Sequence, residues 1–80
     1  MVDYLEEVKK VIEKQFGFEE ETVQEDSYLE ADLNITELDL EDLVAALEDK
    51  YQIRIPSEDS SKFKTVSEIA AYLYEHVDQT

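Results

Sequence analysis

The stretch T-E-L-D-L-E-D-L-V-A-A-L-E-D-K-Y, from Thr36 to Tyr51, has the clearest helical pattern in the chain. Its apolar residues recur at the spacing of one helix face, and its paired alanines favour helix. Thr36 can cap the start, with Asp39 three residues later, and the acidic first turns suit the helix dipole. The pattern predicts a helix from Glu37 to Tyr51, whose apolar stripe consists of Leu40, Leu43, Val44, Leu47 and Tyr51.

Two more amphipathic helices are predicted on either side of this stretch. The first runs from about Asp3 to Phe16 and ends before Gly17, the only glycine of the chain, which is a helix C-terminal signal. The last runs from about Val66 to Val77 and follows Thr65, which forms a capping-box pair with Glu68.

The connections complete an all-α prediction. A long acidic loop from about Gly17 to Thr36 contains scattered apolar residues, so we expect it to pack over the helices. Ile53 to Pro56 is expected to be extended, because the residue before a proline disfavours helix. Ser57 to Phe63 can hold one short helical turn. We therefore predict a single domain over residues 1–80, a four-helix bundle with three main helices, one short helix and a long first loop.

The charge of the chain restricts its partners. The formal net charge is -15 over 80 residues, and no Lys or Arg occurs between Lys14 and Lys50. Such a chain repels nucleic acid and anionic lipid, so a protein with a basic surface is the expected partner. The alternative is that the charge only keeps the domain soluble. No apolar run is long enough to span a membrane and no signal peptide is visible, so we expect a cytoplasmic protein and a monomer.

No arrangement of residues predicts catalysis or a specific metal site. The chain has no cysteine and one histidine, His76, which suits the last turn of a helix better than an active site. Oxygen-bearing residues from Glu30 to Glu41 partly match a calcium loop, but Ile35 stands where that loop needs glycine. We expect no enzyme and no catalytic residue, while weak divalent-ion binding to the acidic face stays an open alternative.

The longer stretch S-Y-L-E-A-D-L-N-I-T-E-L-D-L-E-D-L-V-A-A-L-E-D-K-Y, from Ser27 to Tyr51, resembles the centre of acyl carrier proteins. That family typically reads S-x-L-x-x-D-L-G-x-D-S-L-D, followed by an apolar and acidic helix. The resemblance continues through I-R-I-P at Ile53 to Pro56 and T-V at Thr65. It covers essentially the whole chain and implies the four-helix fold of that family.

The departures from the family pattern lie at the start of the second helix. Asn34 stands at the usual glycine, Thr36 at the usual aspartate, and Glu37 at the serine that carries 4′-phosphopantetheine in the family. Glu37 has no hydroxyl to attack coenzyme A, and the Thr36 hydroxyl is one residue out of register. We therefore expect no cofactor. The alternative is a working acyl carrier in fatty acid, polyketide or related biosynthesis that uses a non-standard attachment site.

The resemblance also implies a docking surface, because the acidic second helix of the family binds basic patches on partner enzymes. The expected partner is then an acyl-transfer or other biosynthetic enzyme. The alternative is that these acids only solubilise the helix and stabilise its start. The predicted partner-binding residues are Glu37, Leu38, Asp39, Glu41, Asp42, Glu48 and Asp49.

Overall fold

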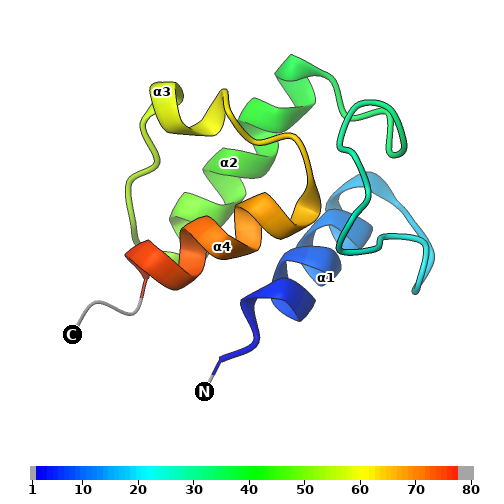
Figure 1. Ribbon diagram of the computed structural model, residues 1–80, viewed down its shortest axis with the longest axis horizontal. Helices are drawn as coiled ribbons and strands as arrows, with labels where there is room; N and C mark the ends of the chain where they lie inside the picture. The colour runs from blue at the N-terminus through cyan, green and yellow to red at the C-terminus, as the bar shows by residue number, and fades with distance from the viewer. Residues whose placement is uncertain (1, 78–80) are drawn as a thin grey trace.

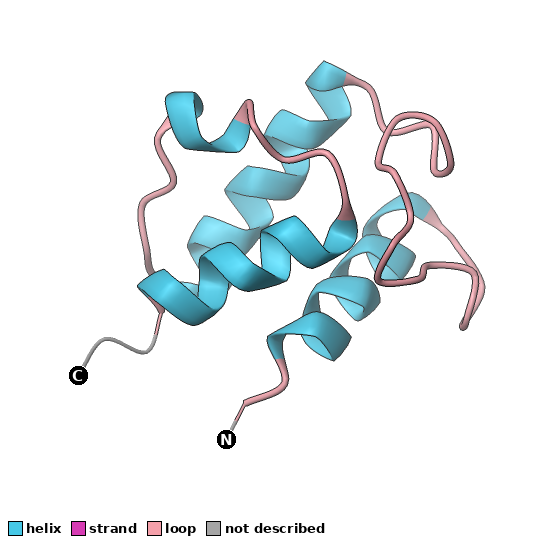
Figure 2. Ribbon diagram, viewed as in Figure 1, coloured by secondary structure: helices cyan, strands magenta, loops and turns pink. Residues whose placement is uncertain are grey.

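The computed structural model describes residues 2–77, and within that range it is all-helical (Figures 1 and 2). The helices are α1 (Tyr4–Phe16), α2 (Glu37–Tyr51), α3 (Ser57–Ser60) and α4 (Val66–His76). The predicted fold class is confirmed, with three main helices and one short helix. No helix among these residues is long and apolar enough to cross a membrane.

The helix ends follow the local signals in the sequence. The Asp3 carboxylate accepts a hydrogen bond from the Glu6 backbone N–H at 3.2 Å, which caps α1. Gly17 ends α1 with φ of 76°, a left-handed conformation that glycine adopts without steric cost. Thr65 and Glu68 form the predicted capping box at the start of α4.

The core is formed by one face of each main helix and by the first loop. α1 packs mainly against α4. Removing the apolar side chains of this core from water supplies most of the driving force for folding. The helical core residues are Tyr4, Val8, Ile12, Leu43, Val44, Leu47, Val66, Ile69, Ala70 and Leu73, and the loop adds Val23, Leu29, Leu33 and Ile35.

The first loop is bonded to the segment that leads into α4. The Leu29 N–H donates to the Lys64 carbonyl at 2.9 Å, and the Val66 N–H donates to the Ser27 carbonyl at 3.2 Å. Around these bonds, Tyr28 and Thr65 form an isolated antiparallel bridge. The expectation that the loop packs over the helices is confirmed, although the Tyr28 side chain remains 55% exposed.

Three polar residues adopt the left-handed backbone conformation that usually favours glycine, namely Glu21 in the first loop and the two residues that flank α2. Asn34 has φ of 59° just before α2, and Gln52 has φ of 55° just after it. Asparagine tolerates this conformation better than most residues, which explains how it replaces the glycine of the family pattern. Glutamine has no such advantage, so α2 ends with local strain.

Tyrosines join the ends of α1, α2 and α4. The Tyr4 ring packs edge-on against Tyr51, with centroids 5.5 Å apart, and against Tyr74, with centroids 4.8 Å apart. The Tyr51 hydroxyl donates a hydrogen bond to the Glu7 carboxylate. Burial, followed by the bond to Glu7, raises the pKa of Tyr51 above its usual value.

Candidate functional site

The start of α2 is organised by a reciprocal pair of hydrogen bonds. The Thr36 hydroxyl oxygen accepts from the Asp39 N–H at 3.3 Å, and the Asp39 carboxylate accepts from the Thr36 N–H at 3.2 Å. The Thr36 hydroxyl also contacts the same carboxylate oxygen at 3.1 Å. Both side chains are therefore engaged in capping the helix, and they hold Glu37 at its first position.

One face of α2 points to solvent along most of its length. Leu38, Asp42, Ala45 and Asp49 follow one another at helical spacing, and all four are exposed. We call these four residues the outer face. Leu38 is 74% exposed, the highest value among the large apolar side chains that the structure leaves uncovered. The outer face thus combines the exposed apolar side chain of Leu38 with the carboxylates of Asp42 and Asp49.

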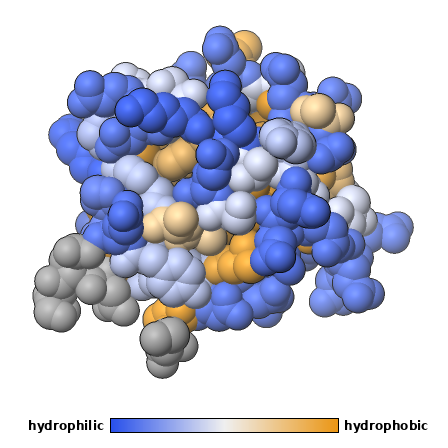
Figure 3. All heavy atoms as spheres, in the orientation of Figure 1, coloured by the Kyte–Doolittle hydropathy of each residue, from blue (hydrophilic) through white to orange (hydrophobic). Residues whose placement is uncertain are grey.

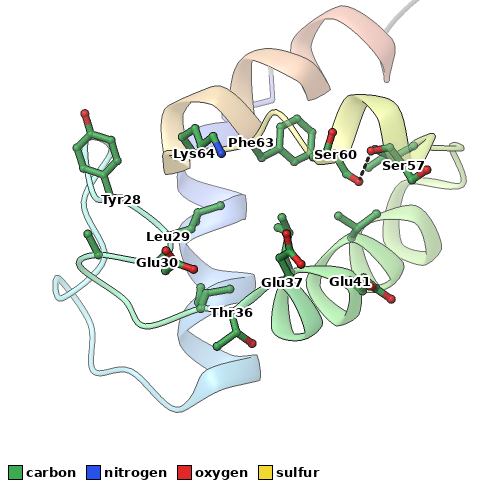
Figure 4. Close-up of a pocket in the computed structure, with 16 residues that line it drawn as sticks. Tyr28, Leu29, Glu30, Thr36, Glu37, Glu41, Ser57, Ser60, Phe63 and Lys64 are labelled. Carbon is green, nitrogen blue, oxygen red and sulfur yellow. Dashed lines mark hydrogen bonds between the residues drawn. The ribbon is translucent and has the colours of Figure 1, made fainter.

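The adjacent side of α2 borders a groove of about 880 Å³, which also involves the first loop and α3 (Figure 4). Figure 4 shows Glu37 and Glu41 on the α2 side, Glu30 on the loop, and Lys64 with Phe63 on the opposite side. This volume lies within the usual range of ligand pockets. The apolar part of the lining consists of Leu29, Ala31, Ile35, Leu40, Val44, Ile55 and Phe63.

Two of the predicted docking acids are engaged within the fold. Glu48 is half-buried, and its carboxylate accepts a hydrogen bond from the Ile55 N–H at 2.7 Å. That bond holds the extended segment after α2 against the helix. Asp39 is half-buried and part of the cap. The other predicted residues are exposed: Glu37, Leu38, Glu41, Asp42 and Asp49.

Among residues 2–77, no basic side chain lies close enough to the exposed acids of α2 for an ion pair. Over residues 2–77, the one ion pair within 4.0 Å joins Lys9 to Glu6, at 2.9 Å, on α1. Lys50 instead lies over the Tyr51 ring, 5.6 Å from its centroid. The negative potential of α2 is therefore not neutralised locally and extends into solvent. Hydrophilic side chains also predominate on the face of the molecule seen in Figure 3.

The structure also places His76 and three serines whose hydroxyls could be considered for chemistry. His76 is the last residue of α4, is exposed, and stacks on Tyr72 with centroids 4.0 Å apart. The Ser27 hydroxyl is buried and accepts from the Gln24 N–H at 3.0 Å, whereas Ser57 and Ser60 line the groove. Within the described range, no group of three or more His, Asp or Glu side chains is placed to hold a metal ion.

Two features of the site were not found from the sequence. The groove depends on contacts between the first loop, α2 and α3, and no local pattern predicts its shape. The hydrogen bond from Ile55 to Glu48 joins two positions that lie on either side of the end of α2. In the sequence, therefore, nothing distinguishes Glu48 from the exposed acidic residues of the same helix. Pro56 was the nearest available signal, because it indicates an extended segment that must find bonding partners elsewhere.

Comparisons with known proteins identify the family. The family described as "Phosphopantetheine attachment site" matches residues 6–73. The chain is also 40% identical over 72 residues to the acyl carrier protein of Helicobacter hepaticus, an alignment that covers 90% of this chain and 95% of that protein.

The residue at the family's attachment position does not fit the prosthetic group chemically. A phosphodiester to 4′-phosphopantetheine needs a hydroxyl oxygen on the protein, and Glu37 presents a carboxylate. The neighbouring Thr36 has a hydroxyl, but that oxygen contacts both the Asp39 N–H and the Asp39 carboxylate. We therefore derive no attachment step at these two residues.

The prediction that this chain has no cofactor is nevertheless wrong. The matching family is defined by phosphopantetheine attachment, and the curated relative is a named acyl carrier protein. The prediction rested on one side chain, Glu37, whereas the match extends over the capped helices, the first loop and the groove. Acyl carrier proteins are carriers and not catalysts, in agreement with the prediction of a non-enzyme. With residues 6–73 matched and 40% identity over 72 residues, the chain belongs to the acyl carrier protein family.

Proposed function

We propose that this chain is a recognition module of its family, which docks through α2 onto a basic surface of an acyl-transfer or other biosynthetic enzyme. One observation supports this most strongly. The outer face is exposed from Leu38 to Asp49, and its carboxylates have no ion-pair partner within the described residues. A surface of this kind is solvated in the free protein and is free to pair with a partner's lysines and arginines.

The charge and the apolar group have different roles in docking. Long-range attraction between the acidic helix and a basic patch accelerates encounter, and it weakens as salt is added. Short-range contact through Leu38, which is 74% exposed, supplies apolar burial once the surfaces meet. The proposal therefore predicts an association rate that depends strongly on salt and a dissociation rate that depends on Leu38.

The other predicted residues take distinct parts in this proposal. Glu41 extends the charged surface towards the groove, and Glu37 places a negative charge where family carriers bear their phosphodiester. Asp39 and Glu48 act indirectly, because their carboxylates hold the start of α2 and the segment after it. Replacing either of these two should alter stability as well as binding.

Charge reversal with a matched control tests the proposal. The partner is first identified by cross-linking and pull-down, and affinities are then measured by surface plasmon resonance. The test variant is Glu41→Lys with Asp42→Lys, and the control is Glu20→Lys with Glu75→Lys. All four positions are exposed, and both variants change the net charge equally. We expect the test variant to lose at least about tenfold more affinity than the control. Equal losses would show that only net charge matters and would refute the docking surface.

The family match favours a second candidate function, a working carrier whose prosthetic group is attached to a hydroxyl other than at position 37. Intact mass after incubation with coenzyme A and a phosphopantetheinyl transferase tests this candidate. A gain of one pantetheine arm, located by fragmentation, would establish it, and an unchanged mass would reject it. The variant Glu37→Ser serves as a positive control, and we expect it to accept one arm more than the parent chain. Localisation in the cytoplasm and a monomeric state stay predictions for both candidates.

A further inference from the structure

A small hollow lies between the short helix α3 and the last helix α4, which Figure 1 shows next to each other. Its volume is about 260 Å³, below the usual range of pockets that enclose a whole ligand, and it suits a single side chain. Among residues 2–77, none from α2 or the first loop lines it, and it shares only Phe63 with the groove. We call it the α3–α4 hollow, and its lining consists of Asp59, Lys62, Phe63, Glu68, Ala71, Tyr72 and Glu75.

One face of α4 forms the floor of the hollow and two of its edges. Glu68, Ala71, Tyr72 and Glu75 follow one another at helical spacing, so they lie on the same side of the helix. Ala71 is exposed and carries only a methyl group, so the surface is low between the two longer glutamates. The hollow therefore has a carboxylate towards each end and a small apolar residue between them.

The aromatic side of the hollow is rigid and uncharged. The Phe63 ring packs edge-on against Tyr72 with centroids 5.4 Å apart, and the His76 ring stacks on Tyr72 with centroids 4.0 Å apart. The Tyr72 hydroxyl donates a hydrogen bond to the Asp59 carboxylate at 2.8 Å. Burial, followed by this bond, raises the pKa of Tyr72 to about 12, so the phenol is neutral at pH 7. An incoming group thus meets a fixed apolar surface.

The three carboxylates of the hollow keep oxygens available for a cation. Glu68 Oε1 accepts from two backbone N–H groups at 2.7 and 2.8 Å, which fixes that side chain. Within residues 2–77, Glu68 Oε2 and Asp59 Oδ1 have no hydrogen bond, and exposed Glu75 has neither a hydrogen bond nor an ion pair. Lys62 is the one basic residue of the lining, and it has no ion pair in that range either. The lining therefore combines three negative charges with one positive charge.

We propose that the α3–α4 hollow receives an arginine side chain of a second protein, other than the enzyme that docks on α2. A guanidinium group is planar and less strongly hydrated than an ammonium, and its five N–H donors can bond to carboxylates at several edges while its face lies on the apolar floor. Because the hollow shares no residue with α2, a protein on the outer face leaves it open. The chain would then join two proteins.

A titration with capped amino acids tests the chemistry of the hollow. The isotope-labelled chain is titrated at constant ionic strength with acetyl-arginine methylamide, and the amide shifts are followed. Acetyl-lysine methylamide has the same charge, and acetyl-citrulline methylamide has nearly the same shape without the charge. We expect saturable shift changes at Lys62, Ala71 and Glu75 with the arginine probe. Its affinity should exceed that of the lysine probe by about threefold, the scale of an exposed ion pair, and the citrulline probe should give no such changes.

Two variants separate the hollow from the general charge of the chain. Ala71→Leu fills the hollow without changing the charge, and we expect it to abolish the saturable response. Its control is Thr22→Leu, which adds a leucine at an exposed position of the first loop and should keep the parent affinity. Glu75→Gln should weaken arginine binding by about threefold. Its control, Glu20→Gln, makes the same change in net charge at another exposed position and should have a smaller effect.

The assignment to a second protein has its own test. The arginine titration is repeated on the chain in complex with the protein that binds α2, and the Ala71 amide is followed. We expect the affinity of the free chain. Loss of the response in the complex would show that the hollow belongs to the α2 interface, and it would overturn the assignment to a second protein without affecting docking through α2.

The site itself would be refuted by any of three results. One is a set of equal shift changes over all acidic surfaces, with equal affinity for the arginine and lysine probes, because that pattern indicates general attraction only. Another is parent-like arginine affinity in Ala71→Leu. The third is equal weakening by Glu75→Gln and Glu20→Gln. If Ala71→Leu does not fold, the comparison of these two charge variants decides the question.

Discussion

Replacing Thr36 with alanine removes the hydroxyl that caps α2. Two contacts are lost, the acceptance from the Asp39 N–H at 3.3 Å and the contact with the Asp39 carboxylate at 3.1 Å. The bond from the Thr36 N–H to that carboxylate can persist in the variant. Both lost contacts are long and exposed, so we expect a cost of about 1 kcal/mol in the free energy of unfolding, within the usual range for such caps. For a domain of this size, that cost lowers the melting temperature by about 4–8 °C.

Urea denaturation followed by circular dichroism measures this cost, with the denaturant slope as a check that compactness is unchanged. Thr65→Ala breaks the equivalent box on α4, where the Glu68 N–H donates to the hydroxyl at 3.3 Å, and should cost about as much. Thr22→Ala is the neutral control, because its exposed side chain has no hydrogen bond within the described residues. If Thr36→Ala unfolds at the same midpoint concentration of urea as Thr22→Ala, the capping argument is refuted.

Other consequences follow from the backbone, the charge and the tyrosines. Gln52→Gly removes the backbone strain of a left-handed non-glycine residue but also removes the side-chain hydrogen bond to the Asp49 carbonyl. We expect the free energy of unfolding, measured by urea denaturation, to rise by about 0.5 kcal/mol, and a decrease would contradict the strain argument. Added NaCl should raise the melting temperature at pH 7, because it screens self-repulsion at a net charge of -15, and a flat response would show that repulsion is unimportant. The folded state raises the pKa of Tyr72 from its usual value of 10.0 to about 12. The stabilisation that the protonated phenol gives to the fold is therefore complete below pH 10 and is lost as the pH rises towards 12. Stability between those pH values should therefore fall less in Tyr72→Phe than in the parent, and parallel curves would contradict the raised pKa.

The helices could be predicted from the sequence because their signals are local. Thr36 with Asp39 and Thr65 with Glu68 lie within one turn of the helices that they cap, and Gly17 directly follows α1. Such residues act through their own backbone neighbourhood, so their effect does not depend on the rest of the fold. The predicted bounds of α2 agree with the structure, and those of α1 and α4 differ by one residue at one end.

The contacts between elements could not be predicted in this way. The bridge between Tyr28 and Thr65, the bond between Tyr72 and Asp59, and the groove itself join residues that share no local pattern. Their positions depend on how the helices pack, which the hydrophobic pattern constrains only in part. For the same reason the sequence did not separate the bonded Glu48 from the exposed acids of α2.

The central claim, that the chain recognises its partner through α2, is tested most directly by nuclear magnetic resonance. The isotope-labelled chain is titrated with the partner protein that the pull-down identifies, and the backbone amide shifts are followed. We predict the largest shift changes at Leu38, Asp42, Ala45 and Asp49, with smaller changes around Glu37 and Glu41. Changes centred on α1 or α4, with the amides of α2 unaffected, would contradict the claim.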